Sequence, residues 1–200
     1  MPVILASEAP EHDRLAVVGW VTSGRSSLKC ILGDKECRHR LLAKGINWDR
    51  VLIGYDGITP VGYAAFKHSW RGPFSPGIRP FIAEFGGFNG VLRYSLFMIS
   101  EWREWYYGFY LYGLRVRKIG QRQGVGSALL KALSGQALSN DYQKIELEVQ
   151  VNNHAALAFY EHHGFTPIRT LDMSWLGRLF NIPPVINLRR TLPLPSMLRP

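Results

Sequence analysis

The chain has 200 residues, 46% of them hydrophobic and 20% charged, which is enough apolar material to bury the core of one soluble globular domain. Its 24 Lys and Arg residues outnumber 15 Asp and Glu residues, and the net charge of +9 favours an anionic partner of some kind. The N-terminus lacks the regions of a signal peptide, and no apolar stretch approaches the ~20 residues of a membrane span, so we expect a cytoplasmic protein without a membrane partner.

The first part of the chain predicts two helices and a hairpin. Helical periodicity covers residues 8–22 and 34–45. Two apolar runs, 51–55 and 61–66, then flank a segment with Asp-Gly and Thr-Pro, which favour a tight turn. We therefore expect these two runs to pair as adjacent strands.

The middle of the chain predicts a loop, a helix and a strand. Residues 70–80 read WRGPFSPGIRP and contain too many helix and strand breakers for either element. Helical periodicity follows from 91 to 105 with many aromatic residues. The stretch 106–116 is rich in the aromatic and branched residues that are typical of strands.

The second half alternates between helices and strands. A helix is predicted from Val125 onward, where apolar residues fall on one face. Residues 144–151 alternate between apolar and polar, so Glu148 points away from the apolar face of the predicted strand. A helix follows with Asn153 as its candidate N-cap.

Two strand-like runs, 165–172 and 185–192, close the domain. The order of elements indicates a mixed α+β or three-layer α/β domain with one sheet, covering residues 1–192 as a single unit. Residues 193–200 contain three prolines and are expected to form a loose tail.

The stretch QRQGVGS, residues 121–127, places glycines between the predicted strand and the predicted helix. A helix N-terminus presents unpaired N–H groups to an anion when side chains do not block the backbone. Gly124 and Gly126 remove those side chains, and Arg122 adds a cation, so the stretch is a candidate phosphate cradle. The alternative is that the glycines only allow close helix–strand packing. A P-loop lacks its Lys-Ser/Thr pair here, and a dinucleotide fingerprint would need Gly or Ala where Leu129 stands.

Two blocks of the sequence resemble the GNAT acetyltransferase superfamily. The cofactor motif Arg/Gln-x-x-Gly-x-Gly/Ala matches Gln121-x-x-Gly124-x-Gly126. LEVQVNNHAALAFYEHHGF resembles the second signature, in which a strand ends in Asn and a helix with a Tyr stops at Gly-Phe. The resemblance covers roughly residues 107–170. It implies a single mixed, mostly antiparallel sheet flanked by helices, and acetyl-coenzyme A (acetyl-CoA) as cosubstrate.

The resemblance also implies how acetyl-CoA is held. The pantetheine arm would contact Asn153 and the backbone of a strand segment that consists of Leu114, Arg115 and Val116. The pyrophosphate would bind backbone N–H groups of the glycine junction, which comprises Gln121, Arg122, Gln123, Gly124, Val125, Gly126 and Ser127.

Two residues are the candidates for proton transfer. Tyr160 matches the general acid of the superfamily, with a plain core tyrosine as the alternative. Glu148 matches the general base of members that acetylate protein N-termini, with a solvated strand residue as the alternative. Glu84, Glu101 and Glu104 are further candidates for the base.

Neither cysteine lies in these motifs, so we expect direct transfer in a ternary complex rather than a cysteine acyl-enzyme. Cys30, Cys37 and His39 could in principle hold a metal, but two ordinary thiols are the favoured interpretation and no metal is expected. Three histidines on or beside the last helix are expected at the surface: His154, His162 and His163.

The acceptor is expected to be a primary amine on a small molecule or a peptide. We expect the loop and helix of residues 68–105 to form a wall of the acceptor site or a homodimer contact, and Trp102, Trp105 and Tyr106 are the residues to test. One alternative function is a coenzyme A-binding regulatory module with weak catalysis. Another is nucleic-acid binding, which is disfavoured because no nucleic-acid-binding signature is present.

Overall fold

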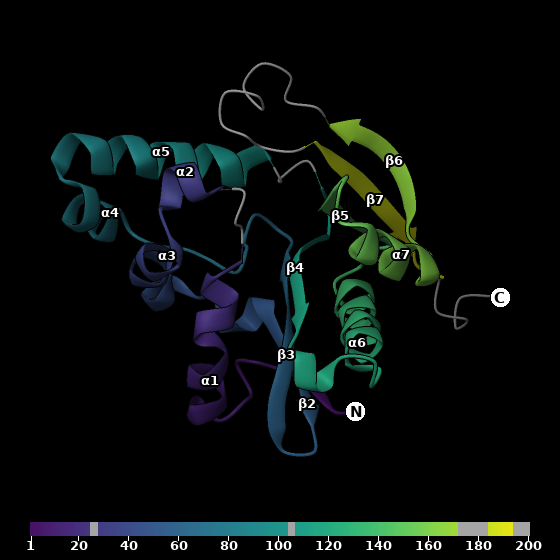
Figure 1. The fold of residues 1–200 in the computed structure, drawn as a ribbon. Coiled ribbons are helices and arrows are strands. Elements are labelled where there is room, and N and C mark those ends of the chain that lie inside the picture. The colour runs from purple at the N-terminus through teal and green to yellow at the C-terminus, as the bar shows by residue number, and fades with distance from the viewer. Residues whose placement is uncertain (25–27, 104–106, 172–183, 194–200) are drawn as a thin grey trace.

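The computed structural model describes residues 1–24, 28–103, 107–171 and 184–193. One sheet crosses the molecule, and helices cover both of its faces (Figure 1). The strands are β1 (Val3–Leu5), β2 (Val51–Asp56), β3 (Thr59–Lys67), β4 (Tyr110–Val116), β5 (Lys144–Gln150), β6 (Thr166–Leu171) and β7 (Val185–Thr191). The α-helices are α1 (Glu11–Thr22), α2 (Lys29–Leu32), α3 (Lys35–Leu42), α4 (Ile78–Phe85), α5 (Gly87–Arg103), α6 (Val125–Ser139) and α7 (His154–His162). Short 3₁₀ turns cover Ala43–Gly45, Trp48–Arg50 and Lys118–Gly120.

The strand order is β1-β2-β3-β4-β5-β7-β6. Every neighbouring pair is antiparallel except β4 and β5, which are parallel. The prediction of a single mixed, mostly antiparallel sheet is therefore confirmed. The predicted hairpin is β2–β3, and Gly57 at its turn has a positive φ of 57°, a conformation that glycine adopts without steric cost.

Each face of the sheet has its own hydrophobic core. Helices α6 and α7 lie on one face, and α1 to α5 lie on the other (Figure 1). The α6 core contains Leu129, Leu133 and Leu147, whereas the opposite core contains Phe81 and Phe97 from the α4–α5 pair. The alternation of the 144–151 run is thus explained by burial of its apolar residues beneath α6 and α7.

Several element boundaries differ from the sequence expectation. Strand β4 begins at Tyr110, because residues 107–109 form a bend rather than continuing the strand. The end of the expected loop 70–80 is already part of α4. Its proline, Pro80, lies in the first helical turn, where the missing N–H is not needed for a helix bond. Strand β1 was not expected, because its three residues are specified by pairing with β2 rather than by a local pattern.

Four features named above lie outside the described residues: Glu104, Trp105, Tyr106 and most of the tail, 194–200. Among the residues that are described, none of the helices is both long and apolar enough to cross a membrane.

Candidate active site

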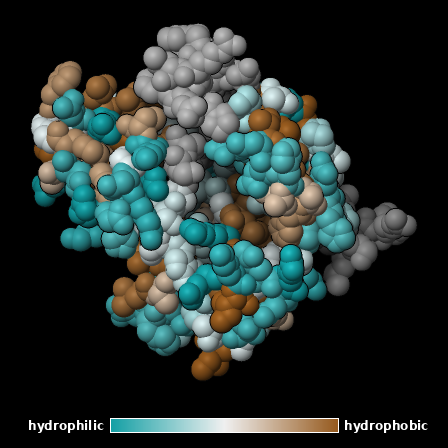
Figure 2. All heavy atoms as spheres, viewed as in Figure 1, coloured by the Kyte–Doolittle hydropathy of each residue, from teal (hydrophilic) through white to brown (hydrophobic). Residues whose placement is uncertain are grey.

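The parallel strands β4 and β5 separate almost as soon as they meet. Their register contains one pair, Tyr110 with Glu146, and the Glu146 N–H donates to the Phe109 carbonyl at 3.0 Å. Beyond this pair the strands diverge, so the sheet has an opening in the middle. The space-filling view also shows a hollow between the α1–α5 side and the α6–α7 side (Figure 2).

The open edge of β4 presents backbone groups to this opening. At the end of β4, the Arg117 N–H donates to the Val61 carbonyl of β3 at 2.8 Å. Backbone groups alternate direction along an antiparallel strand, so those of Leu114 and Val116 point away from β3 and toward the opening. The Gln121 side-chain amide already donates to the Val116 carbonyl at 3.3 Å.

The glycine junction forms the N-terminus of α6 at the end of β4. Gly124 is the N-cap residue with φ 81°, and no side chain caps the helix. Arg122 also has a positive φ, 62°, and it is exposed. Within the described residues, no capping side chain therefore occupies the first N–H groups of α6, as an anion site at a helix N-terminus requires.

Gly126 has a packing role that is independent of any ligand. A Cβ at this position would lie 3.0 Å from the Phe159 ring of α7, closer than side chains normally approach. A Cβ at Gly124 would meet open space. The two readings of the glycines thus apply to different residues: Gly126 allows α6 and α7 to pack, and Gly124 leaves the helix end accessible.

A histidine joins the two helices at this point. The ring of His163 lies between the Phe159 carbonyl and the Ser127 hydroxyl, with both nitrogen–oxygen distances at 2.8 Å. Because a carbonyl only accepts, Nδ1 carries a proton and donates to Phe159, and Nε2 shares a hydrogen bond with the Ser127 hydroxyl. The expectation that His163 is a surface residue is wrong, since the residue is half-buried and bridges α6 and α7. His154 and His162 are exposed.

A cavity of about 660 Å³ lies beside the end of β4, between this strand and α1. Arg115 and Arg117 contribute to its lining, and both are anchored: Arg115 donates to the Ser23 hydroxyl at 3.1 Å, and Arg117 stacks over the Trp20 ring at 5.2 Å. No acidic side chain is among the described residues that line the cavity, and four are basic: Lys35, Arg115, Arg117 and Lys118. The cavity is therefore suited to an anionic group.

Asn153 is the N-cap of α7 and Tyr160 lies within this helix, on the other side of the opening. The Asn153 side chain accepts from the Ala156 N–H at 3.2 Å, which confirms its N-cap role. Tyr160 is 8% exposed and packs edge-on against Phe159 and Phe165. Burial raises the pKa of the Tyr160 hydroxyl, and Tyr63 of β3 adds to this rise. Tyr160 is thus protonated at neutral pH, as a proton donor must be.

Glu148 lies on the opposite face of β5 from the α6 core, as the alternation predicts. Its carboxylate accepts from the Tyr107 hydroxyl at 3.1 Å, and Tyr107 in turn accepts from the Arg169 guanidinium at 3.1 Å. Burial raises the pKa of Tyr107, while the Arg169 hydrogen bond opposes this rise. Tyr107 therefore remains a donor that orients the carboxylate of Glu148.

Asn187 of β7 adds an amide to this polar face. It is opposite Glu148 in the register, it is 1% exposed, and it lies beside the Tyr107 hydroxyl. Within the described residues, neither its amide nitrogen nor its amide oxygen makes a hydrogen bond of good geometry. The sequence did not indicate Tyr107 or Asn187, because each of them is about forty residues from Glu148 in the chain and meets it only in the folded sheet.

A model of the acetyltransferase (GNAT) family matches residues 33–165, which include the glycine junction and the block with Glu148 and Tyr160. The chain belongs to this family. The resemblance stated from the sequence is therefore confirmed, and the donor used in this family is acetyl-CoA.

The individual relatives of this GNAT chain match it either over a short stretch or at low sequence identity. It is 41% identical to mycothiol acetyltransferase from Jonesia denitrificans over 58 residues, which are 29% of this chain and 18% of that protein, so it spans less than a fifth of that relative. The structure of ribosomal-protein-alanine N-acetyltransferase from Brucella melitensis gives a TM-score of 0.55 at 18% identity, over 96% of this chain and all of the other. A crystal structure described as an acetyltransferase gives 0.59 at 16% identity, over 96% and 100% of the two chains. At these identities the two structures support the fold alone.

The other acidic candidates are already occupied within the GNAT fold. Glu84 accepts from the Arg40 guanidinium at 2.8 Å, on the outer side of α3 and α4. Glu101 is 5% exposed and is paired with Lys67 at 3.0 Å, and it also accepts from the Tyr112 hydroxyl at 2.7 Å. Neither carboxylate belongs to β5, whose polar face carries Glu148.

The two cysteines are both free thiols and differ in exposure. Cys30 is exposed, and Cys37 is buried in the core beneath α3. Burial raises the pKa of the Cys37 thiol to about 11, and a hydrogen bond with Glu84 adds to this. Cys37 is therefore a neutral thiol, poorly suited to act as a nucleophile. Among the described residues, no three His, Cys, Asp or Glu side chains gather as a metal site would require.

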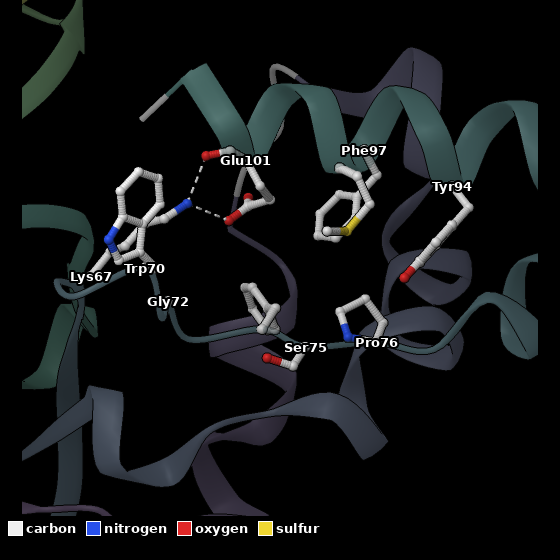
Figure 3. Close-up of a pocket in the computed structure, with 10 residues that line it drawn as sticks. Lys67, Trp70, Gly72, Ser75, Pro76, Tyr94, Phe97 and Glu101 are labelled. Atoms are coloured by element: carbon white, nitrogen blue, oxygen red, sulfur yellow. Dashed lines mark hydrogen bonds and ion pairs between the residues drawn. The ribbon is translucent and has the colours of Figure 1, made fainter. Parts of the chain in front are cut away.

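The segment between β3 and β4 encloses a second cavity, of about 170 Å³ (Figure 3). The Lys67–Glu101 pair closes one end, and side chains of α5 form one wall above the loop with Ser75 and Pro76. Tyr112 connects this cavity to β4, since its hydroxyl donates to Glu101 and its ring packs edge-on against Phe74. The apolar lining consists of Trp70, Phe74, Pro76, Tyr94, Phe97 and Met98.

Proposed function

We propose that this chain is an N-acetyltransferase that moves an acetyl group from acetyl-CoA to a primary amine within a ternary complex. The observation that carries the proposal is the opening between β4 and β5, which leads directly to the uncapped N-terminus of α6. Family membership supports the class of reaction, and the opening supports the presence of a donor site in this particular chain.

The residues at the opening fit the chemistry of acetyl-CoA. Its pantetheine arm carries amide groups, which the backbone of Leu114 and Val116 can bind as a neighbouring strand would. Its phosphates match the N–H groups from Gly124 onward and the basic cavity at the end of β4. When bound, acetyl-CoA supplies the acetyl group as a thioester.

Glu148 and Tyr160 are proposed to move the protons. The amine nitrogen forms a bond to the acetyl carbon while the carbon–sulfur bond breaks, so one proton must leave the nitrogen and one must reach the sulfur. We assign the first to Glu148, held by Tyr107, and the second to the protonated hydroxyl of Tyr160. The two side chains lie on opposite faces of β5, consistent with acceptor and donor approaching from different sides.

The acceptor is proposed to carry a compact apolar group beside its amine. The cavity under α5 is lined mainly by apolar side chains, and its ion pair is internally neutralised, so it does not favour a second cation. A cavity of ~150 Å³ is large enough for a benzene ring, and this one, of about 170 Å³, could hold such a ring against its apolar wall. Aromatic or branched aliphatic amines should therefore be better acceptors than small polar amines.

The first test is calorimetric titration with acetyl-CoA. Wild-type protein should bind one equivalent, whereas Gly124→Glu and Gln123→Glu should weaken binding at least tenfold, because each adds a negative charge at the α6 N-terminus. Gly135→Glu is the matched control, since it adds the same charge at an exposed glycine on the same helix. Equal binding by all four proteins would refute the donor site.

The second test follows thiol release with a panel of amines, such as phenethylamine and ethanolamine. Faster turnover of the aromatic amine, which Met98→Trp should reduce by filling the cavity, would support the acceptor assignment. Donor binding without turnover of any amine or N-terminal peptide would instead favour the regulatory coenzyme A-binding module.

A further inference from the structure

Helix α5 carries a stripe of exposed, mostly apolar residues, and one of them, Met98, lies at the edge where it also lines the cavity under the helix. We call the following seven positions the α5 stripe: Phe88, Val91, Leu92, Ser95, Met98, Ile99 and Trp102. All seven are exposed, and the exposed fractions reach 83% at Phe88, 61% at Ile99 and 59% at Trp102. In the space-filling view, hydrophobic residues gather at the upper left, where α5 lies in Figure 1 (Figure 2).

The opposite side of α5 is apolar as well. Phe97 and Tyr94 pack against Phe81 of α4, with ring centroids 5.9 and 5.3 Å apart. A helix that is apolar on both sides is normally buried on both sides. Within the described residues, these ring contacts lie on the inner side of α5, whereas the side chains of the stripe keep a large exposed fraction.

The α5 stripe is large enough to matter for association. At roughly 150–200 Å² for a large apolar side chain, the exposed fractions correspond to about 600 Å² per protomer. The largest apolar patch on a monomer is typically ~300–600 Å², and a standard interface buries ~800 Å² per partner. The stripe, together with its polar margins, therefore approaches the area of a stable dimer interface.

The α5 stripe is also symmetric about its smallest member. Counting outward from Ser95, large apolar residues occur three, four and seven positions away in both directions. An antiparallel copy of α5 that crosses at Ser95 would therefore oppose Leu92 to Met98. By the same spacing it would oppose Val91 to Ile99 and Phe88 to Trp102, each pair formed twice.

We propose that two copies of this chain associate through the α5 stripe, antiparallel about a two-fold axis that passes beside Ser95. A two-fold interface uses the same patch on both copies, and a stripe that is its own mirror in spacing meets this requirement. The small side chain of Ser95 lets the helix backbones approach at the crossing point. Met98 also lines the cavity under α5, so the partner copy would lie against one wall of that cavity.

A lipid surface is the main competitor for an exposed apolar helix, and the charges favour it less. Helices that lie on anionic membranes carry Lys and Arg along the edges of their apolar face. In the middle of α5, Arg93 is instead directed inward to the Cys30 and Ile31 carbonyls, at 3.0 and 2.8 Å, and stacks over the Phe85 ring. The spacing symmetry about Ser95 would serve no purpose at a lipid surface.

The first experiment is sedimentation velocity on the full chain. Wild-type protein should sediment as a dimer, and Ile99→Glu should shift it to a monomer, because each copy would bury a charge against the partner's Val91. Ile58→Glu is the matched control, since Ile58 is a 93% exposed isoleucine in the β2–β3 turn, and it should remain a dimer. Circular dichroism verifies that the variants are folded.

The second experiment tests the axis itself by disulfide trapping. Helices that cross with axes ~8–10 Å apart bring facing Cα atoms to ~4–6 Å, which is within the range of a disulfide. In a Cys30→Ser background, Ser95→Cys should therefore form a covalent dimer on mild oxidation, whereas Ser139→Cys, exposed on α6, should not. A protein that stays monomeric, with no Ser95→Cys crosslink, overturns the proposal. So does a monomer that co-sediments with phosphatidylserine vesicles, because the stripe would then face lipid.

Discussion

The proposed reaction depends on the hydroxyl of Tyr160 as its proton donor. Its pKa is raised by burial, so the hydroxyl should stay protonated over the whole pH range in which the enzyme is folded. Tyr160→Phe should lower kcat by about 10²–10⁴-fold, the usual contribution of a general acid, with little change in acetyl-CoA affinity. The check is steady-state kinetics beside calorimetric titration. Tyr142→Phe, which removes a hydroxyl bonded to Ser69 instead, should leave kcat unchanged.

Substitutions at Glu148 and Tyr107 distinguish the proposed base, Glu148, from the residue that positions it, Tyr107. Glu148→Gln should lower kcat/KM by about 10²-fold or more, since the amide cannot accept the proton. Tyr107→Phe should have a smaller effect, because Glu148 loses one hydrogen bond and keeps its carboxylate. An unchanged kcat/KM in Glu148→Gln, measured by steady-state kinetics, would exclude Glu148 as the base.

At the scale of single residues, the sequence identifies candidate functional residues better than it identifies the side chains that contact them. Glu148 and Tyr160 could be identified from a local motif, because strand alternation and a helix stop are visible within twenty residues. The Tyr107–Glu148 and His163–Ser127 bonds could not, because each joins elements whose proximity depends on the completed sheet. A surface position is expected for His163 because it and the adjacent His162 cannot share one helical face, and helical periodicity alone cannot show that α6 lies beside it.

At the scale of elements, the packing of α6 against α7 depends on Gly126. Gly126→Ala should destabilise the fold by about 1–3 kcal/mol, the usual cost of overpacking, since the new methyl group would press on the Phe159 ring. Urea denaturation measures the loss. Phe159→Leu should restore part of it in the double variant, because contacting residues are energetically coupled. An additive double variant would show that the two side chains do not oppose each other.

The elements themselves were largely predictable, with informative exceptions. Long periodic segments such as α6 and β5 were identified because each buries one regular face under a core. The start of α4 was missed because a proline was read as a breaker, although it occupies the first helical turn. Strand β4 begins at Tyr110, later than the predicted start at residue 106. This difference reflects tertiary packing, since Tyr107 turns to stack on Tyr110 instead of extending β4.

For the whole molecule, one histidine gives a specific pH dependence of stability. The ring of His68 packs against the rings of Phe66 and Phe109, and burial lowers its pKa, with the charge of Arg50 acting in the same direction. The unfolded chain therefore binds a proton near pH 6.5 that the folded chain resists. Its contribution to stability is complete above pH 6.5 and is lost as the pH falls from there toward the lower pKa of the fold.

Urea unfolding at pH 7.5 and pH 5.5 measures this effect. The free energy of unfolding should fall more for the wild-type protein than for His68→Phe, which retains an aromatic ring without the titrating group. His154→Gln, at an exposed site, should behave as the wild type does. Glu84, whose pKa is lowered by Arg40, contributes in a separate window below about pH 4.5. An equal drop for the wild type and His68→Phe would show that other groups cause the acid sensitivity.

The single β4–β5 pair has a consequence for the lifetime of the protein. Strands β4 and β5 are joined at Tyr110 and Glu146 alone, and beyond this pair the N–H groups on the facing edges of the two strands have no neighbouring strand among the described residues, so their amide protons should exchange faster. A bound donor lying along β4 would act as the missing strand and would tie the two strands together. The concentration of acetyl-CoA would then affect resistance to proteases as well as turnover, because the protein without bound acetyl-CoA opens more easily than the complex.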